Sequence, residues 1–222
     1  MANLFDGHDE ATKWGAMVRA GKMAIEQNGY SMEKRPGRGL SNIWAIKKDG
    51  AEKIACIRTT RDRYIAFPPL EKATKWKTLD EVDLVVVATV DDKDDPQKVL
   101  VYLFPADDVR KRFDANVAAR VAANQPPRDN FGMWVALDLD QRKLPISVGS
   151  GIVEKYQPIA EFSLQSLLNA SLEGEAMDEP DTEEARSGPT TVAKVMADAR
   201  ERLASLLGVR PEAVKLDLRI EY

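Results

Sequence analysis

One run of nine residues, VDLVVVATV at 82–90, constrains the fold of this chain more than any other feature. It is almost continuously apolar and rich in β-branched side chains, and it lacks the polar–apolar alternation of a strand with one solvated face. Such a run predicts a central strand that is covered on both faces. A domain built on it needs helices or loops on each side of a sheet.

The neighbouring segments predict the other elements. Apolar residues at three- and four-residue spacing predict a helix over 9–28, and Asn28-Gly29 supplies its end. Asp49-Gly50 predicts the tight turn of a hairpin between strands near 41–48 and 52–58. The segment 30–41, which contains Pro36 and two glycines, is expected to be a loop. Further strands are expected at 63–67, 99–104 and 131–139, and further helices at 105–123 and 159–171.

These elements predict an α+β fold over residues 1–171, with a mixed central sheet flanked by helices. The following stretch, 172–189, holds seven acidic residues and one Arg with Gly and Pro, and it has no periodic apolar pattern. We therefore expect an exposed, flexible acidic linker. Residues 190–222 predict a C-terminal unit made of an amphipathic helix and an alternating strand.

Composition limits the class of protein and the cellular compartment that we expect. A chain of 222 residues that is 44% hydrophobic can bury a sizeable core. Its one cysteine excludes an internal disulfide framework and is typical of a reducing cytoplasm. No basic-then-apolar signal opens the sequence, and the longest apolar run is too short to cross a bilayer. We expect a cytoplasmic protein with no membrane partner.

The net charge of −4 conceals an uneven distribution. Residues 33–77 carry twelve Lys and Arg against five Asp and Glu, a balance of +7 that leaves −11 for the rest. A clustered basic surface is typical of proteins that bind polyanions such as DNA. The alternative is that these lysines and arginines only solvate strand faces and turns.

Three positions in the hairpin decide what chemistry it can do. Asn42 begins the first strand, and Cys56-Ile57-Arg58 lies in the second, followed by Thr59-Thr60-Arg61. Together with the order helix, loop, hairpin, buried strand, strand, helix and strand, this segment resembles the core of the PD-(D/E)xK nuclease superfamily, the restriction-endonuclease-like fold. The resemblance covers roughly residues 9–140. In that family the first strand carries Asp and the second carries Glu-x-Lys, so all three signature positions differ here.

The differences remove the usual metal chemistry of that family. Mg²⁺ prefers charged oxygen ligands, whereas Asn42 offers one neutral carbonyl and Cys56 a soft sulfur. Arg58 keeps the positive charge but cannot lose its proton near neutral pH. The resemblance therefore implies an inactive nuclease-like protein, without catalytic residues, metal or cofactor, that binds DNA or scaffolds a nucleoprotein complex. The expected phosphate contacts are Arg35, Arg38, Lys47, Arg58, Arg61 and Arg63.

Each residue also has a purely structural interpretation. Cys56 is typical of a small buried hydrophobic residue, and Asn42 of a hydrogen-bond partner for the neighbouring strand. Arg58 is equally compatible with a structural ion pair. The four tryptophans fit core packing better than base stacking.

Two other functions stay open. One is a protein-interaction module that binds no nucleic acid, in which the strand at 213–222 pairs with a partner or with a second copy of the chain. The other is a working Mg²⁺-dependent nuclease whose carboxylates have migrated to Glu26, Glu33 or Asp83.

Overall fold

The computed structural model describes residues 4–35 and 42–173. Its centre is a mixed six-stranded sheet in the order β1-β2-β3-β7-β8-β10. Only β3 and β7 run parallel, and the other neighbours are antiparallel. The strands are β1 (Ser31–Lys34), β2 (Ile43–Lys48), β3 (Ala51–Thr60), β7 (Leu84–Val90), β8 (Lys98–Pro105) and β10 (Ala160–Ser163).

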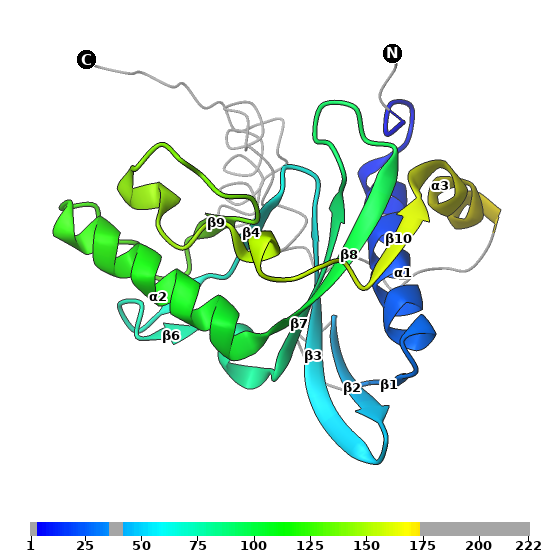
Figure 1. The fold of residues 1–222 in the computed structure, drawn as a ribbon, viewed down its shortest axis with the longest axis horizontal. Coiled ribbons are helices and arrows are strands. Elements are labelled where there is room, and N and C mark those ends of the chain that lie inside the picture. Colours follow the sequence, from blue (N-terminus) through cyan, green and yellow to red (C-terminus); the bar gives the residue numbers. More distant parts are fainter. Residues whose placement is uncertain (1–3, 36–41, 174–222) are drawn as a thin grey trace, which may run out of the picture. The chain divides into compact units, whose positions relative to one another are not determined.

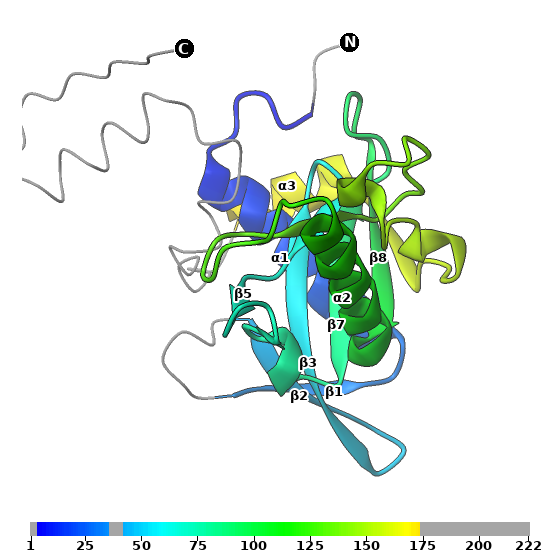
Figure 2. The ribbon, with the colours of Figure 1, turned by 90° about the vertical axis from the view of Figure 1, so that its left-hand side faces the viewer.

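Helices cover both faces of this sheet (Figure 1). One face packs against α1 (Glu10–Gln27) and α3 (Leu164–Glu173), and the other against α2 (Ala106–Ala122). In Figure 2, α2 crosses in front of the sheet. On the α2 side lie two small ribbons, one made of β4 (Tyr64–Ala66) and β9 (Trp134–Ala136), the other of β5 (Pro69–Leu70) and β6 (Lys75–Trp76). Three short 3₁₀ turns complete this side: η1 (Leu79–Glu81), η2 (Pro145–Ser147) and η3 (Ile152–Glu154).

The prediction of a strand covered on both faces is confirmed. Every residue of β7 is buried. Val86 and Ala88 face the cluster under α1, whereas Val85 and Val87 face the cluster under α2. A fully buried Val contributes roughly 1.5–3 kcal/mol relative to an exposed one, so this strand is a main source of stability.

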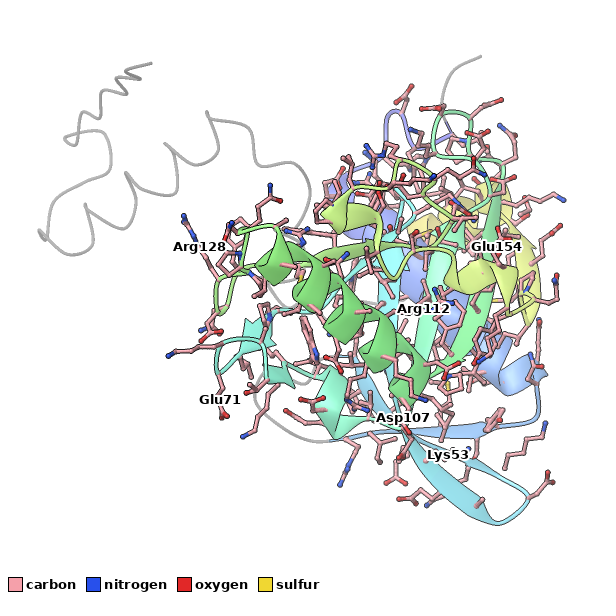
Figure 3. The ribbon with its side chains drawn as sticks, turned by 60° about the vertical axis from the view of Figure 1, so that its left-hand side comes forward. Lys53, Glu71, Asp107, Arg112, Arg128 and Glu154 are labelled. Atoms are coloured by element: carbon pink, nitrogen blue, oxygen red, sulfur yellow. The ribbon has the colours of Figure 1, made fainter. Side chains whose placement is uncertain are left out.

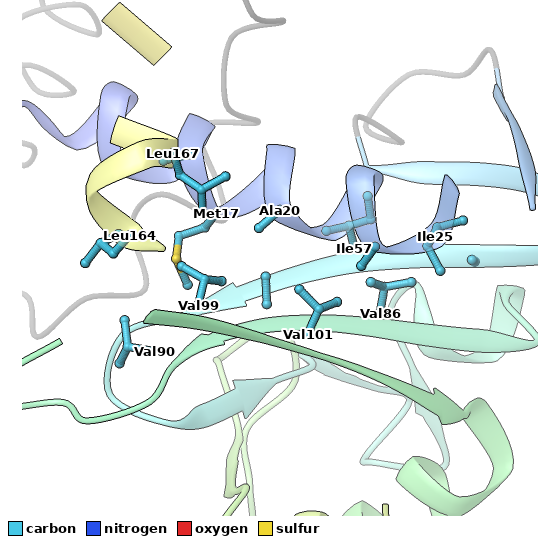
Figure 4. Packing of buried hydrophobic residues seen from close by; sticks show 14 of the residues in the cluster. Met17, Ala20, Ile25, Ile57, Val86, Val90, Val99, Val101, Leu164 and Leu167 are labelled. Carbon is cyan, nitrogen blue, oxygen red and sulfur yellow. The ribbon is translucent and has the colours of Figure 1, made fainter. Parts of the chain in front are cut away.

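Helix α1 packs closely against one face of the sheet. Met17 and Ala20 point from α1 toward the sheet, and Ile57 and Val86 point from the sheet toward α1 (Figure 4). A Cβ added at Gly21 would lie only 3.0 Å from the Ile57 side chain, so the small residue lets the helix approach the sheet. The expected helix over 9–28 is confirmed, and the Asp9 side chain caps it by accepting from the Thr12 backbone N–H at 2.7 Å.

The hairpin is confirmed too. Asp49 and Gly50 both have positive φ, 52° and 77°, as the predicted two-residue turn requires. The β2–β3 register places Ile43 opposite Cys56 and Lys47 opposite Glu52.

Three expectations from the sequence were wrong in part. The loop expected over 30–41 contains the edge strand β1, whose four mostly polar residues carry no alternating pattern and are held by pairing with β2. The helix expected over 159–171 begins only at Leu164, because Ala160 and Phe162 turn toward the core and pair with β8 as a strand. The strand expected over 131–139 is confirmed only at 134–136.

The expected linker beyond Glu173, the C-terminal unit at 190–222 and Arg38 lie outside the described residues. Among the helices that are described, none combines the length and the apolar character needed to cross a membrane.

Candidate nucleic-acid interface

The three signature positions occupy two different settings. Cys56 is completely buried in the cluster between the sheet and α2. Arg58, two residues on, places its guanidinium 4.7 Å from the centre of the Phe67 ring. Asn42 lies beside Ile57 instead, since its carbonyl accepts from the Ile57 N–H at 2.9 Å. The register therefore aligns Cys56 with Ile43 and not with Asn42.

The acidic residues considered for a migrated metal site form no such centre. Over residues 4–35 and 42–173, no three His, Cys, Asp or Glu side chains are grouped so as to hold a metal ion. The Asp83 carboxylate accepts from the Ile54 backbone N–H at 2.8 Å, and Glu33 lies 4.0 Å from Lys47 on the neighbouring strand.

The expected phosphate contacts lie in separate places. Lys47 is near the hairpin tip, where it pairs with Glu52 at 2.9 Å, and Arg35 is exposed just after β1. Arg61 lies past the far end of β3 and pairs with Glu10 at 2.8 Å. In Figure 3 the hairpin, where Lys53 is labelled, and the segment of Arg128 lie on opposite sides of the domain.

Arg63 has a structural role. Its guanidinium makes two hydrogen bonds to the Asp138 carboxylate, at 2.6 and 2.8 Å, and also donates to the Val90 carbonyl. Hydrogen bonding to Asp138 raises the pKa of Arg63. This residue therefore ties the turn after β3 to the end of β7 and to the segment after β9.

A different surface gathers aromatic side chains. In the β4–β9 ribbon, Ile65 and Val135 face the core, whereas Tyr64 and Trp134 stand on the outer face. Tyr64 pairs with Ala136, and Ala66 with Trp134, so the two aromatic residues are diagonal neighbours on one face.

Phe131 extends this aromatic face. Its ring lies 6.0 Å from that of Trp134 in an edge-to-face arrangement, and its side chain is 64% exposed. The Trp134 ring lies directly over Gly132, where an added Cβ would approach the indole to 2.6 Å. We call Tyr64, Phe131 and Trp134 the aromatic row.

Cationic side chains lie at both ends of the aromatic row. Arg128 is exposed in the turn that precedes Phe131, whose N–H donates to the Arg128 carbonyl at 3.2 Å. At the other end, Asp140 and, to a smaller extent, the nearby Tyr64 hydroxyl raise the pKa of Arg142. Lys143 is exposed next to Arg142.

The carboxylates around the aromatic row are engaged within the protein. Asp62 accepts from Thr60 and from the Tyr64 N–H, and Asp129 accepts from the Lys72 N–H. Asp138 and Asp140 bind Arg63 and Arg142 as described. Hydrogen bonds from Arg142 and Ser147 hold the pKa of Asp140 well below its usual range. Asp138 and Asp140 are therefore paired with arginine, Asp62 and Asp129 are hydrogen-bonded to neutral donors, and the Arg128 and Lys143 charges face solvent.

The loop that carries Arg142 is held by polar side chains of α2. Asn116, fully buried, donates to the carbonyls of Ile146 and Val148 at 3.0 and 2.7 Å. Arg112 donates to the carbonyls of Gly149 and Ser150 at 2.9 and 2.8 Å. Four backbone acceptors are satisfied in this way, so the loop is fixed although it lacks regular structure apart from η2.

The same loop displays apolar side chains. Leu139, Leu144 and Val148 are exposed and line an open hollow of about 630 Å³, with Asp140, Gln141, Lys143 and Ser147 also in its wall. These side chains form a small apolar patch on the surface of the loop.

Comparisons with protein-family models, with curated proteins and with solved structures give no match to this chain.

Sequence reasoning missed the aromatic row because Tyr64 and Phe131 are far apart in the chain and only the pairing of β4 with β9 joins them. A usable signal was the alternation in Tyr64-Ile65 and Trp134-Val135, in which the aliphatic residue is buried and the aromatic one faces outward.

The surface combines aromatic rings with flanking guanidinium and ammonium groups. The rings can contact bases, and the cationic groups can contact phosphates.

Proposed function

We propose that this protein binds nucleic acid and does not cleave it by metal-dependent hydrolysis. The observation that carries the proposal is the aromatic row, with Arg128 at one end and Arg142 and Lys143 at the other. Cations of this kind attract a phosphate backbone, and exposed aromatic rings add contacts to bases.

The absence of cleavage follows from the residues at the signature positions. Cys56 is enclosed in an apolar cluster, and Arg58 lies against Phe67. Neither residue offers the charged oxygen ligands that Mg²⁺ prefers. In this proposal the domain is a nuclease-like fold of the PD-(D/E)xK kind whose active site has been lost, and it works in a reducing cytoplasm on DNA.

Charge reversal at the aromatic row tests the binding. The variant Arg128→Glu with Lys143→Glu should bind a labelled oligonucleotide at least about tenfold more weakly, because each change replaces attraction to phosphate by repulsion. The matched control, Lys53→Glu with Lys111→Glu, makes the same change in net charge on the hairpin and on the outer side of α2. Equal losses in the two variants would contradict this location of the site.

The cleavage half of the proposal has its own assay. Plasmid and oligonucleotide incubated with the protein and Mg²⁺ or Mn²⁺ should remain intact. Cleavage that disappears in Glu26→Gln or Asp83→Asn would overturn this half and support a migrated active site.

A second candidate function is docking of a protein partner, here a second copy of the chain. The exposed hollow lined by Leu139, Leu144 and Val148 favours it. Sedimentation velocity should then show a dimer that dissociates in Leu139→Asp with Leu144→Asp. A monomer across the whole concentration range would exclude this use of the hollow.

A further inference from the structure

The aromatic row has features that a duplex does not require. Rings that only fill a core are enclosed, yet Phe131 is 64% and Tyr64 37% exposed. In a double helix the faces of the bases are covered by stacking, so aromatic side chains of a protein reach them only where the strand is single.

The geometry points to single-stranded nucleic acid as the ligand of this surface, with bases stacked on Tyr64, Trp134 and Phe131 and phosphates held by Arg128 and Arg142. This inference rests on the proposed function and names its substrate class. It assigns a direct role to three side chains that the sequence alone did not distinguish from packing residues.

The aromatic row is held by the packing of its strands. Tyr64 and Trp134 belong to paired strands whose inner residues, Ile65 and Val135, are anchored in the core. Trp134 is further fixed by its contact with Gly132 and by the Phe131 ring. A rigid aromatic platform loses little conformational entropy when a base stacks on it.

The groups on this surface follow one another in a definite order. The row runs from the turn at Arg128, through Phe131 and Trp134, to Tyr64, and the loop that carries Arg142 follows Ala136, the strand partner of Tyr64. A strand laid along it meets a cation at each end and aromatic rings between them. This order of groups matches a backbone that alternates phosphates and bases.

The cations at the ends of the row include two arginines, Arg128 and Arg142. The guanidinium of Arg142 donates to Asp140 through Nε and one terminal nitrogen, at 2.7–3.1 Å, which fixes the position of the side chain. Arginine both pairs with phosphate oxygens and stacks on flat rings, whereas lysine acts as a point charge. Two of the carboxylates nearby, Asp138 and Asp140, are paired with Arg63 and Arg142, which reduces their repulsion of the ligand.

The test compares a single strand with a duplex of equal length. Fluorescence anisotropy of a labelled 15-nucleotide oligothymidylate is measured on the full chain and on Tyr64→Ala and Phe131→Ala. Each loss of a stacking ring should weaken binding by about 5- to 150-fold. Val121→Ala, which removes part of a 52% exposed side chain on α2, is the matched apolar control and should leave affinity unchanged.

A second readout does not depend on alanine variants. Stacking on Trp134 should quench part of the tryptophan fluorescence when oligothymidylate is added, and Trp134→Phe should abolish that part while it keeps most of the affinity. Melting temperatures of all variants are measured together with binding, so that loss of folding is recognised.

The outcomes separate the two proposals. If the Arg128 and Lys143 variant binds more weakly while the folded aromatic variants bind as tightly as the wild type, the stacking inference is overturned and the proposal of nucleic-acid binding stands. Equal affinity for single strand and duplex, or equal losses for both in the aromatic variants, would also overturn the inference. No binding of either probe at low salt would overturn the proposed function itself.

Discussion

At the scale of single residues, Arg58 shows how burial changes the meaning of a motif. Cys56 and Arg58 follow each other at a two-residue interval in β3, so both face the side chains under α2. The guanidinium lies over the Phe67 ring instead of extending freely into solvent. Arg61, three residues later, is 44% exposed and pairs with Glu10. The two arginines should therefore respond differently to mutation.

We predict that Arg58→Ala lowers the free energy of unfolding by about 1–2 kcal/mol, through loss of the cation–π contact and of packing. Arg61→Ala should cost less than about 1 kcal/mol, since exposed ion pairs contribute little. Thermal melts of both variants measure this, with Arg58→Lys as a control that keeps the charge. Unchanged melting of Arg58→Ala with lost affinity for DNA would instead place Arg58 in the binding surface.

At the scale of elements, α2 holds several irregular segments in place. Asp114 accepts from the Trp76 indole N–H at 2.9 Å, and Arg110 binds Asp80 at 2.7 Å, so one flank of α2 holds the 76–81 segment. Asp108, near the start of the helix, binds Lys155 and Tyr156. Asn116 and the arginines beside it hold the 146–150 loop.

We predict that Asn116→Ala destabilises the protein by about 2–4 kcal/mol, because two backbone carbonyls then lose their buried donor. The 146–150 loop should open, and trypsin should cut after Arg142 or Lys143 much faster than in the wild type. Urea unfolding and limited proteolysis measure the two effects. Asn169→Ala, at an exposed position of α3, should change neither, and equal behaviour of the two variants would refute the role of Asn116.

The Asp140 network makes the loop sensitive to acid. Since Arg142 and Ser147 lower the pKa of Asp140 in the folded state, its contribution to stability is complete above the ordinary pKa near 3.9. That contribution is lost as the pH falls toward the lower, folded-state value. Melting temperatures of wild type and Asp140→Asn should differ by a constant amount from pH 5 to 8, and the difference should narrow progressively as the pH falls below about 4. A difference that is as wide at pH 3 as at pH 7, or an equal pH response of the control Asp94→Asn, would contradict this.

At the scale of the whole molecule, regular local patterns could be predicted from the sequence, whereas the pairing of short edge strands and of strands far apart in the chain could not. The uninterrupted run at 82–90, the spacing of apolar residues in α1 and the Asp49-Gly50 turn each carry their structure locally, and all three are confirmed. The edge strands β1 and β10 are short and stabilised by their neighbours, so their own residues gave no clear period.

The candidate site was harder to predict from the sequence than the edge strands, because tertiary structure brings its residues together. The predicted phosphate contacts came from one stretch of sequence, and the fold distributes those that it describes over the hairpin tip, the α2 face and the turn after β3. The aromatic row joins β4 to a segment about 70 residues away. Strand pairing at such separation is set by the packing of Ile65 and Val135 into the core, which no local pattern specifies.

The central claim is that a cationic aromatic surface binds nucleic acid, and the salt dependence of binding tests it most directly. The affinity for a labelled single strand is measured between 50 and 300 mM salt. Three or four phosphate contacts predict a slope of log K against log salt of about −2 to −3, because each contact contributes about −0.7. Arg128→Ala should reduce the slope by about one contact. A slope near zero, or no binding at 50 mM salt, would contradict the claim.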